Sequence, residues 1–127
     1  MSKLYIAVDG DDVGHYLEYL MLKNDTNELT QFATKYKQTM EWFAQTVEQT
    51  FEASFIFEGG DNLLFFVDEK NFSIEKLEIF RSDFANRVGR TLSIGLGYNA
   101  RESYFALKLC KVSGKNCICR YEELNNA

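Results

Sequence analysis

The chain has 127 residues, of which 14 are lysine or arginine and 19 are aspartate or glutamate, so its formal net charge is -5. A protein that binds a nucleic-acid duplex usually carries a basic stripe, because much of its affinity comes from counterion release at phosphates, and this acidic balance argues against that function. The hydrophobic fraction of 46% excludes a disordered chain, and the length predicts one domain over residues 1–127.

Neither a membrane span nor a secretory signal is evident. The longest apolar run covers residues 63–67, far below the roughly 20 residues that span a bilayer. Near the N-terminus, Lys3 is followed by five apolar residues before Asp9, which is too few for the hydrophobic region of a secretory signal. We therefore expect a cytoplasmic protein without a membrane partner.

The first half of the chain predicts a buried strand followed by two helices. Residues 4–8 form a short β-rich apolar run, typical of a central strand covered on both faces. Apolar residues then recur at helical spacing over 13–21 and again over 29–47, with a break at 25–27. Asp12 stands where it could cap the first of these helices.

A hairpin is predicted next. Two β-rich runs, 53–57 and 63–67, flank the turn EGGDN at 58–62. The two glycines and the aspartate of this turn therefore lie at the tip of the hairpin.

The rest of the chain predicts a helix, a strand, a second helix and a short closing strand, over residues 74–88, 91–98, 101–113 and 116–120. Ser73 is placed to cap the first of these helices and Gly89 to end it, and Gly114 follows the second. The element order contains a β-α-β-β-α-β core with an extra helix after the first strand and a C-terminal α-β extension. This order predicts an α+β, ferredoxin-like fold whose antiparallel-rich sheet has its helices packed on one face.

Two acidic clusters are expected to meet in this fold. The run DGDDVG at 9–14 ends the first strand, and the run GGD at 59–61 forms the hairpin tip. Because the first strand lies beside the hairpin in such a sheet, the clusters share one edge. Carboxylate oxygens are the ligands that Mg²⁺ or Mn²⁺ prefers, and glycines allow a nucleotide to approach the backbone closely. Each motif taken alone is also an ordinary surface turn.

A cluster of lysines follows near the end of the chain. Lys111 and Lys115 belong to the run KVSGKN, and Lys108 precedes it by about one helical turn. One interpretation is that cations near a helix C-terminus interact favourably with the helix dipole. The functional interpretation is that these lysines contact the phosphates of a nucleoside triphosphate.

The three motifs in this order resemble those of the palm-type nucleotidyl cyclases. That group includes the diguanylate cyclase (GGDEF) domains and the polymerase subunit of type III CRISPR complexes. At this length the chain most resembles the minimal CRISPR polymerase (mCpol) family, which is associated with anti-phage defence through cyclic dinucleotides. The resemblance covers nearly the whole chain and implies a single palm domain.

The resemblance also implies roles for individual residues. Asp9 and Asp61 correspond to the catalytic, metal-binding acids, and the carbonyl of Gly10 to a backbone ligand of the same ion. The implied nucleotide-binding residues are Gly14, Gly59, Gly60, Lys108, Lys111 and Lys115. The chain departs from the family at Asn62, where relatives usually have a second acid. Its side-chain carbonyl is still a candidate neutral ligand, and Asp11 and Asp12 are further candidate ligands that could compensate for the lost charge.

The implied reaction is attack of a ribose hydroxyl on the α-phosphate of a second nucleotide, with Mg²⁺ or Mn²⁺ as cofactor and ATP as the first expected substrate. The product would be a cyclic di- or oligonucleotide read by a cyclic-nucleotide-responsive effector, and two facing palms predict a homodimer. One alternative is a degenerate palm that binds nucleotide as a sensor. Another is a palm-like GTP cyclohydrolase, although those relatives carry two palm copies.

Two further features are interpreted as unrelated to the chemistry. The run GLGYNA at 95–100 matches a dinucleotide-binding fingerprint, but too few residues follow it for the second half of that fold, so small residues there are expected to allow close packing. His15 is interpreted as a surface or base-stacking residue rather than a general base.

Three cysteines lie near the end of the chain, at Cys110, Cys117 and Cys119. Structural zinc sites combine four Cys or His ligands, and no such cluster is apparent around the Cys-x-Cys pair. We expect three reduced thiols packed in the interior and no metal centre.

Overall fold

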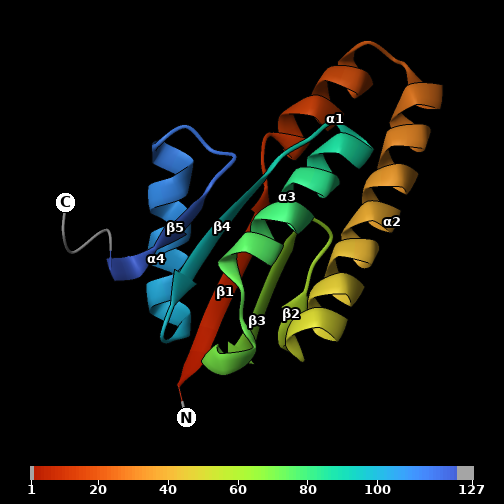
Figure 1. The fold of residues 1–127 in the computed structure, drawn as a ribbon. Helices are drawn as coiled ribbons and strands as arrows, with labels where there is room; N and C mark the ends of the chain where they lie inside the picture. Colours follow the sequence, from red (N-terminus) through yellow and green to blue (C-terminus); the bar gives the residue numbers. More distant parts are fainter. Residues whose placement is uncertain (1, 123–127) are drawn as a thin grey trace.

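The computed structural model of the chain describes residues 2–122, so the first residue and the last five residues of the predicted domain lie outside that range. The elements follow the predicted order (Figure 1): β1 (Lys3–Gly10), α1 (Val13–Leu22), α2 (Thr26–Phe51), β2 (Ser54–Glu58), β3 (Asn62–Asp68), a 3₁₀ turn (Glu69–Asn71), α3 (Ile74–Val88), β4 (Leu92–Gly97), α4 (Ala100–Val112) and β5 (Ile118–Arg120). Among these helices, none is both long enough and apolar enough to cross a membrane.

The strands form one mixed sheet in the order β2-β3-β1-β4-β5. β1 pairs antiparallel with both β3 and β4, β2 pairs antiparallel with β3, and β5 joins β4 in parallel through α4. The predicted α+β class, the β-α-β-β-α-β core and the place of the first strand beside the hairpin are therefore confirmed.

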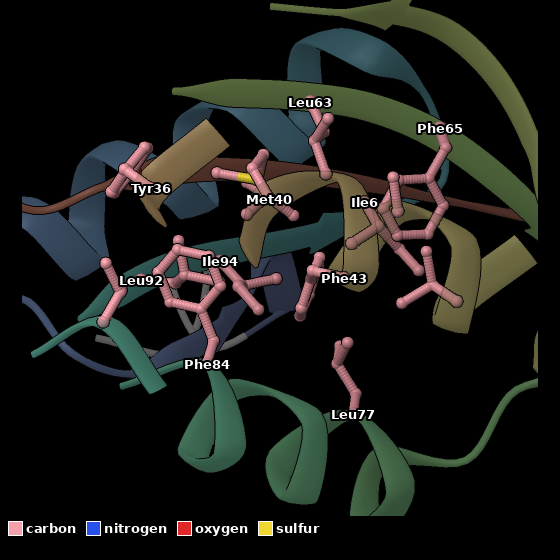
Figure 2. Close-up of a cluster of buried hydrophobic side chains, with 14 of the residues drawn as sticks. Ile6, Tyr36, Met40, Phe43, Leu63, Phe65, Leu77, Phe84, Leu92 and Ile94 are labelled. Carbon is pink, nitrogen blue, oxygen red and sulfur yellow. The ribbon is translucent and has the colours of Figure 1, made fainter. Parts of the chain in front are cut away.

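The main hydrophobic core lies between one face of the sheet and the helices α2 and α3. Figure 2 shows large side chains of both layers meeting there: Ile6, Phe65 and Ile94 from the strands and Phe43, Leu77 and Phe84 from the helices. All six have a relative exposure of 0%. This packing fixes β1 and β3, whose ends carry the acidic clusters.

The prediction that the helices pack on one face of the sheet is wrong for α4, which covers the opposite face. Ala7 of β1 pairs with Gly95 of β4. The residues before and after each of them belong to the main core, so Ala7 and Gly95 lie on the opposite face of the sheet, under α4. A Cβ built on Gly95 would lie 2.2 Å from the backbone nitrogen of Leu107 and 2.2 Å from the carbonyl oxygen of Ser103. The glycine therefore allows the backbone of α4 to touch β4, which confirms packing as the reason for the small residues in this run.

The ends of the helices follow the predicted caps with one exception. The side chain of Ser73 accepts a hydrogen bond from the backbone of Lys76 at 3.2 Å, and Gly89 ends α3 with a φ of 73°. The prediction that Asp12 caps α1 is wrong. Its backbone is left-handed, its side chain makes no capping bond, and its carboxylate instead pairs with Lys115.

The prediction of three reduced cysteines is wrong for Cys110 and Cys117. Cys110 and Cys117 form a disulfide, and Cys119 Sγ lies 3.8 Å from Cys117 Sγ. The backbone of Lys115 donates to the carbonyl of Cys110 at 2.9 Å, so the chain folds back on the end of α4 and brings the sulfurs together. The loop 111–116 is thereby closed by a covalent bond at its two ends.

Candidate functional site

The two acidic clusters lie side by side at one end of β1. Asp9 pairs with Asn62 in the register of β1 and β3, and the backbone N–H of Gly10 donates to the carbonyl of Asp61 at 2.8 Å. The structure thus brings Asp9 and Asp61 together from residues that are far apart in the sequence.

Lys111 of α4 reaches this acidic edge from the opposite face of the sheet. Its Nζ lies 3.3 Å from a carboxylate oxygen of Asp9 and 2.6 Å from Asp11, and it donates to the carbonyl of Gly10 at 3.0 Å. Burial raises the pKa of Asp9; the cation of Lys111 opposes this shift, and the charges of Asp61 and Asp11 add to it. Asp9 is therefore a carboxylate whose negative charge is only partly compensated.

Asp11 is enclosed by hydrogen-bond donors rather than open to a ligand. The residue is 3% exposed, and its two carboxylate oxygens accept from four donors: Lys111 Nζ at 2.6 Å, Ser93 Oγ at 2.7 Å, Thr91 Oγ1 at 2.7 Å and the backbone N–H of Asn116 at 3.0 Å. Burial acts to raise the pKa of Asp11, but the bonds from Lys111, Ser93 and Thr91 together outweigh burial and lower it. The side chain thus positions the loop 111–116 against β1 and β4.

Replacing Asp11 with Asn is expected to destabilise the protein by about 2–4 kcal/mol, because the new amide nitrogen would face other hydrogen-bond donors and Lys111 would lose the nearer of its two carboxylate partners. The free energy of unfolding in urea measures this effect. Asp12→Asn is the control; its side chain is 46% exposed and pairs with Lys115 at the surface, so solvent screens the pair and its loss should change the stability much less. Equal losses from the two variants would contradict the role given to Asp11.

Asp12 and Lys115 form an exposed ion pair beside the cluster. The hydrogen bond from Lys115 lowers the pKa of Asp12, and the same bond raises the pKa of Lys115. Lys115 has a left-handed backbone and is accessible from solvent. Of the two lysines in the KVSGKN run, Lys115 is the one whose charge can turn toward an incoming phosphate without leaving a buried partner.

A cavity of about 630 Å³ opens next to Asp61, between α1, α2 and the hairpin tip. Its walls are mostly apolar, with Val13, Leu17, Phe32 and Met40 among the lining residues, and Gly14 and Gly60 lie on its rim. An apolar pocket of this size with a few polar groups at its edge is typical of small-molecule sites.

Tyr36 of α2 joins this cavity to the acidic edge. The residue is 5% exposed, and its hydroxyl has no hydrogen-bond partner within residues 2–122. Burial, together with the charges of Asp61, Asp9 and Asp11, raises its pKa above the ordinary value. A Cβ on Gly10 would lie 2.0 Å from this hydroxyl. The sequence indicates only that Tyr36 belongs to an apolar helical stripe, and no local signal marks its position beside the acids.

The two hairpin glycines differ in their surroundings. A Cβ on Gly59 would lie 2.0 Å from Asn62 Oδ1, whereas one on Gly60 would meet nothing within 4 Å. Gly59 thus makes room for the side chain of Asn62, and Gly60 leaves space that a ligand could use. The side-chain oxygen of Asn62 therefore lies against Gly59, and Asp9 and Asp61 are the two acids at the open edge formed by the end of β1 and the hairpin tip.

Lys108 and His15 lie apart from Asp61 and its cavity. Lys108 Nζ stands 5.2 Å from the ring centroid of Tyr104 and lines a second cavity of about 540 Å³ on the α4 side of the sheet, together with Asp9 and Lys111. The side chain of His15 is 85% exposed and lies 3.9 Å from Glu18 on α1.

Asp9, Asp61 and the Gly10 carbonyl offer the types of oxygen that a hard divalent cation prefers, and Lys111 Nζ contacts two of them, Asp9 and the Gly10 carbonyl. Mg²⁺ and Mn²⁺ favour carboxylate and carbonyl oxygens and keep water or phosphate in the remaining positions. Asp9 carries a charge that burial and its acidic neighbours disfavour, and a bound cation would relieve that cost. We therefore assign Asp9, Asp61 and the Gly10 carbonyl as the candidate metal ligands.

Comparisons with known proteins agree with this architecture. A family model described as the minimal CRISPR polymerase domain (mCpol) matches residues 5–121. The active GGEEF domain of a diguanylate cyclase from Vibrio cholerae has a similar fold, with a TM-score of 0.63 at 19% identity over 95% of this chain and 83% of that one. The GGDEF domain of DgcB from Caulobacter crescentus, in complex with c-di-GMP, gives 0.63 at 15% identity over 95% and 79%. A search of curated proteins finds no match.

Proposed function

The chain belongs to the minimal CRISPR polymerase (mCpol) family, and from this premise we propose that it is a metal-dependent nucleotidyltransferase that joins nucleoside triphosphates into a cyclic di- or oligonucleotide. ATP is the first candidate substrate, and pyrophosphate is the second product. The cyclic nucleotide would act as a second messenger in anti-phage defence, bound by a downstream effector that responds to it.

One observation carries this proposal: Asp61 lines an apolar cavity large enough for a nucleobase, and Asp9, paired with Lys111, lies next to Asp61 through the backbone hydrogen bond from Gly10. The cavity between α1 and α2 would take the base of the donor nucleotide. Its triphosphate would extend past Gly60 toward Lys115, whose charge stabilises phosphate oxygens.

In the reaction, the hydroxyl oxygen of the acceptor ribose attacks the α-phosphorus of the donor. The bond from that phosphorus to the bridging oxygen breaks, and pyrophosphate leaves with the electron pair. A Mg²⁺ or Mn²⁺ ion held by Asp9, Asp61 and the Gly10 carbonyl would supply Lewis-acid stabilisation of the charge on phosphate and lower the pKa of the attacking hydroxyl. Its proton passes to solvent, so the exposed His15 is not required as a base. Lys111 holds the carboxylate of Asp9 in place through its ion pair.

The direct test is incubation of the pure protein with each of the four nucleoside triphosphates and Mg²⁺ or Mn²⁺, followed by mass identification of the products. We expect pyrophosphate release and a product whose mass equals that of joined nucleotides without free phosphate ends. Parallel reactions with chelator should give none. A ring-opened guanine nucleotide would instead identify a cyclohydrolase, and an unchanged substrate with all four bases would contradict an enzymatic function.

A sensor that binds nucleotide without turnover is the second candidate, and Asn62 is the observation that favours it. Asn in place of an acid removes one negative charge from the metal-binding edge. Tight nucleotide binding in the absence of any product would support the sensor.

The acceptor nucleotide can be supplied in two ways. In a homodimer of facing palms, each protomer holds one nucleotide with its hydroxyl directed at the other; in a single protomer, both nucleotides bind the same chain. A homodimer is expected to lose activity per protomer on dilution, and nucleotide should strengthen its association. Activity assays over a wide range of protein concentration, with light scattering at the same concentrations, measure this. Constant specific activity from a monomeric species would contradict the homodimer.

A further inference from the structure

We propose that the second cavity, on the α4 side of Asp9, is a binding site for the acceptor nucleotide, whose base is held between Phe57 and Tyr104. This inference rests on the proposed function. The cavity measures about 540 Å³ and is lined by residues of β1, β2, β3 and α4, within the range typical of small-ligand sites. Asp9 lines this second cavity, whereas Asp61 lines the first.

The fold leaves this part of the sheet uncovered. Phe57, Leu64, Ala7 and Gly95 form one cross-strand row from β2 to β4 on the face that α4 covers. α4 packs on the Gly95 end of the row and lies over β4, β1 and β5, away from β2 (Figure 1). The Phe57 end remains open because one helix cannot cover five strands.

A β-bulge turns Phe57 toward this open surface. Phe55 pairs with Phe65, but Phe57 pairs with Leu64, because the register of β2 shifts between Phe55 and Phe57. Phe65 faces the main core and Leu64, its neighbour, faces the other side. Without the bulge, two-residue alternation would place Phe57 on the same face as Phe55. Bulges that redirect a side chain in this way are common next to active sites.

The aromatic rings at the rim remain largely exposed. Phe57 is 47% and Tyr104 is 52% exposed, although both line the cavity. Large aromatic side chains exposed at a pocket are suited to stacking on a nucleobase, which does not require a particular base.

The second cavity also has lysines that could contact the phosphate of a nucleotide. Lys108 stands beside Tyr104 at the rim, and Lys111 lines the inner end together with Asp9. A nucleotide stacked on the two rings would place its phosphate near Lys108 and its ribose toward Asp9, where the hydroxyl must act. The hydroxyl oxygen then forms the bond to the α-phosphorus of the donor while pyrophosphate departs, as in the proposed reaction.

The test is calorimetric titration of the protein with α,β-methylene ATP and Mg²⁺, which reports binding without turnover. Two equivalents per protomer are expected for the unaltered protein. Tyr104→Ala should weaken the second binding step by about ten- to a hundredfold, since stacking of one base on an aromatic ring has about that effect, and Tyr104→Phe should restore it. Phe105→Ala is the matched control: Phe105 lies on the same helix with 49% exposure but outside the cavity lining, so both steps should remain.

Three results would overturn this site: one equivalent per protomer in the unaltered protein, a second step that is unaffected by Tyr104→Ala, or equal losses in Phe105→Ala. Product formation by the unaltered protein tests the proposed function separately. If the protein is active but shows a single binding step, the acceptor site is refuted and the proposed function stands. If it binds two equivalents without forming product, the enzymatic function is refuted and the second site stands.

Discussion

Replacing Asp61 with Asn is expected to abolish product formation, with a loss of at least about a thousandfold in rate. Its carboxylate is one of two side-chain acids at the open edge, and loss of metal-assisted charge stabilisation costs several kcal/mol in the transition state. Asp9→Asn should have the same effect. The measurement is pyrophosphate release in the presence of ATP and Mg²⁺ or Mn²⁺.

The fold should survive these substitutions. Asp61 lies at an exposed hairpin tip, and its negative charge contributes to raising the pKa of Asp9, so its removal relieves repulsion. Far-ultraviolet circular dichroism and the melting temperature should stay close to those of the unaltered protein. Asp68→Asn, at the far end of β3, the strand that follows the hairpin tip, controls for the loss of a negative charge and should retain activity. Full activity in Asp61→Asn would contradict the catalytic mechanism.

Gly95→Ala is expected to cause the largest loss of stability, at least about 3 kcal/mol in the free energy of unfolding. The added Cβ would meet the backbone of Leu107 and Ser103, both at 2.2 Å, and a backbone cannot rotate away as a side chain can. Overpacking of a tight contact typically costs about 1–3 kcal/mol, and a forced movement of α4 should exceed that range. Urea denaturation followed by circular dichroism measures the effect.

Gly14→Ala is the matched control for this prediction. It lies in α1, and a Cβ there would meet nothing within 4 Å. Alanine is about 1 kcal/mol more favourable than glycine inside a helix, so the variant should be as stable as the unaltered protein or more so. An unchanged free energy of unfolding in Gly95→Ala would contradict the close contact between the backbones of α4 and β4.

The local elements of the fold could be predicted because their signals lie within a few residues. Ser73 accepts from a backbone N–H three positions later, and Gly89 takes a left-handed backbone that glycine adopts without strain. Apolar spacing distinguishes helix from strand over similarly short windows. The sequence does not predict the β-bulge after Phe55. Every residue from 53 to 57 except Ser54 is apolar, so no apolar-polar alternation marks the point where the strand changes register.

The candidate site was predictable in part. The pairing of the first strand with the hairpin follows from the order of the elements, and this pairing places Asp9 beside Asp61. Within the run DGDDVG, nothing in the sequence indicates that Asp11 is buried and structural while Asp9 and Asp12 are more exposed. Its partners Thr91, just before β4, and Ser93, within it, lie some eighty residues later in the chain, and only the assembled sheet brings them together.

By itself, the sequence determined the element order, the α+β class and the three motifs that resemble a palm-type cyclase, because each depends on residue types at short spacing. Only the tertiary structure decided that α4 covers the second face of the sheet, that Cys110 meets Cys117 and that the hydroxyl of Tyr36 faces the acids. These features depend on contacts between surfaces of separate elements. Whether two such surfaces meet is set by the packing of the whole core, which no local pattern records.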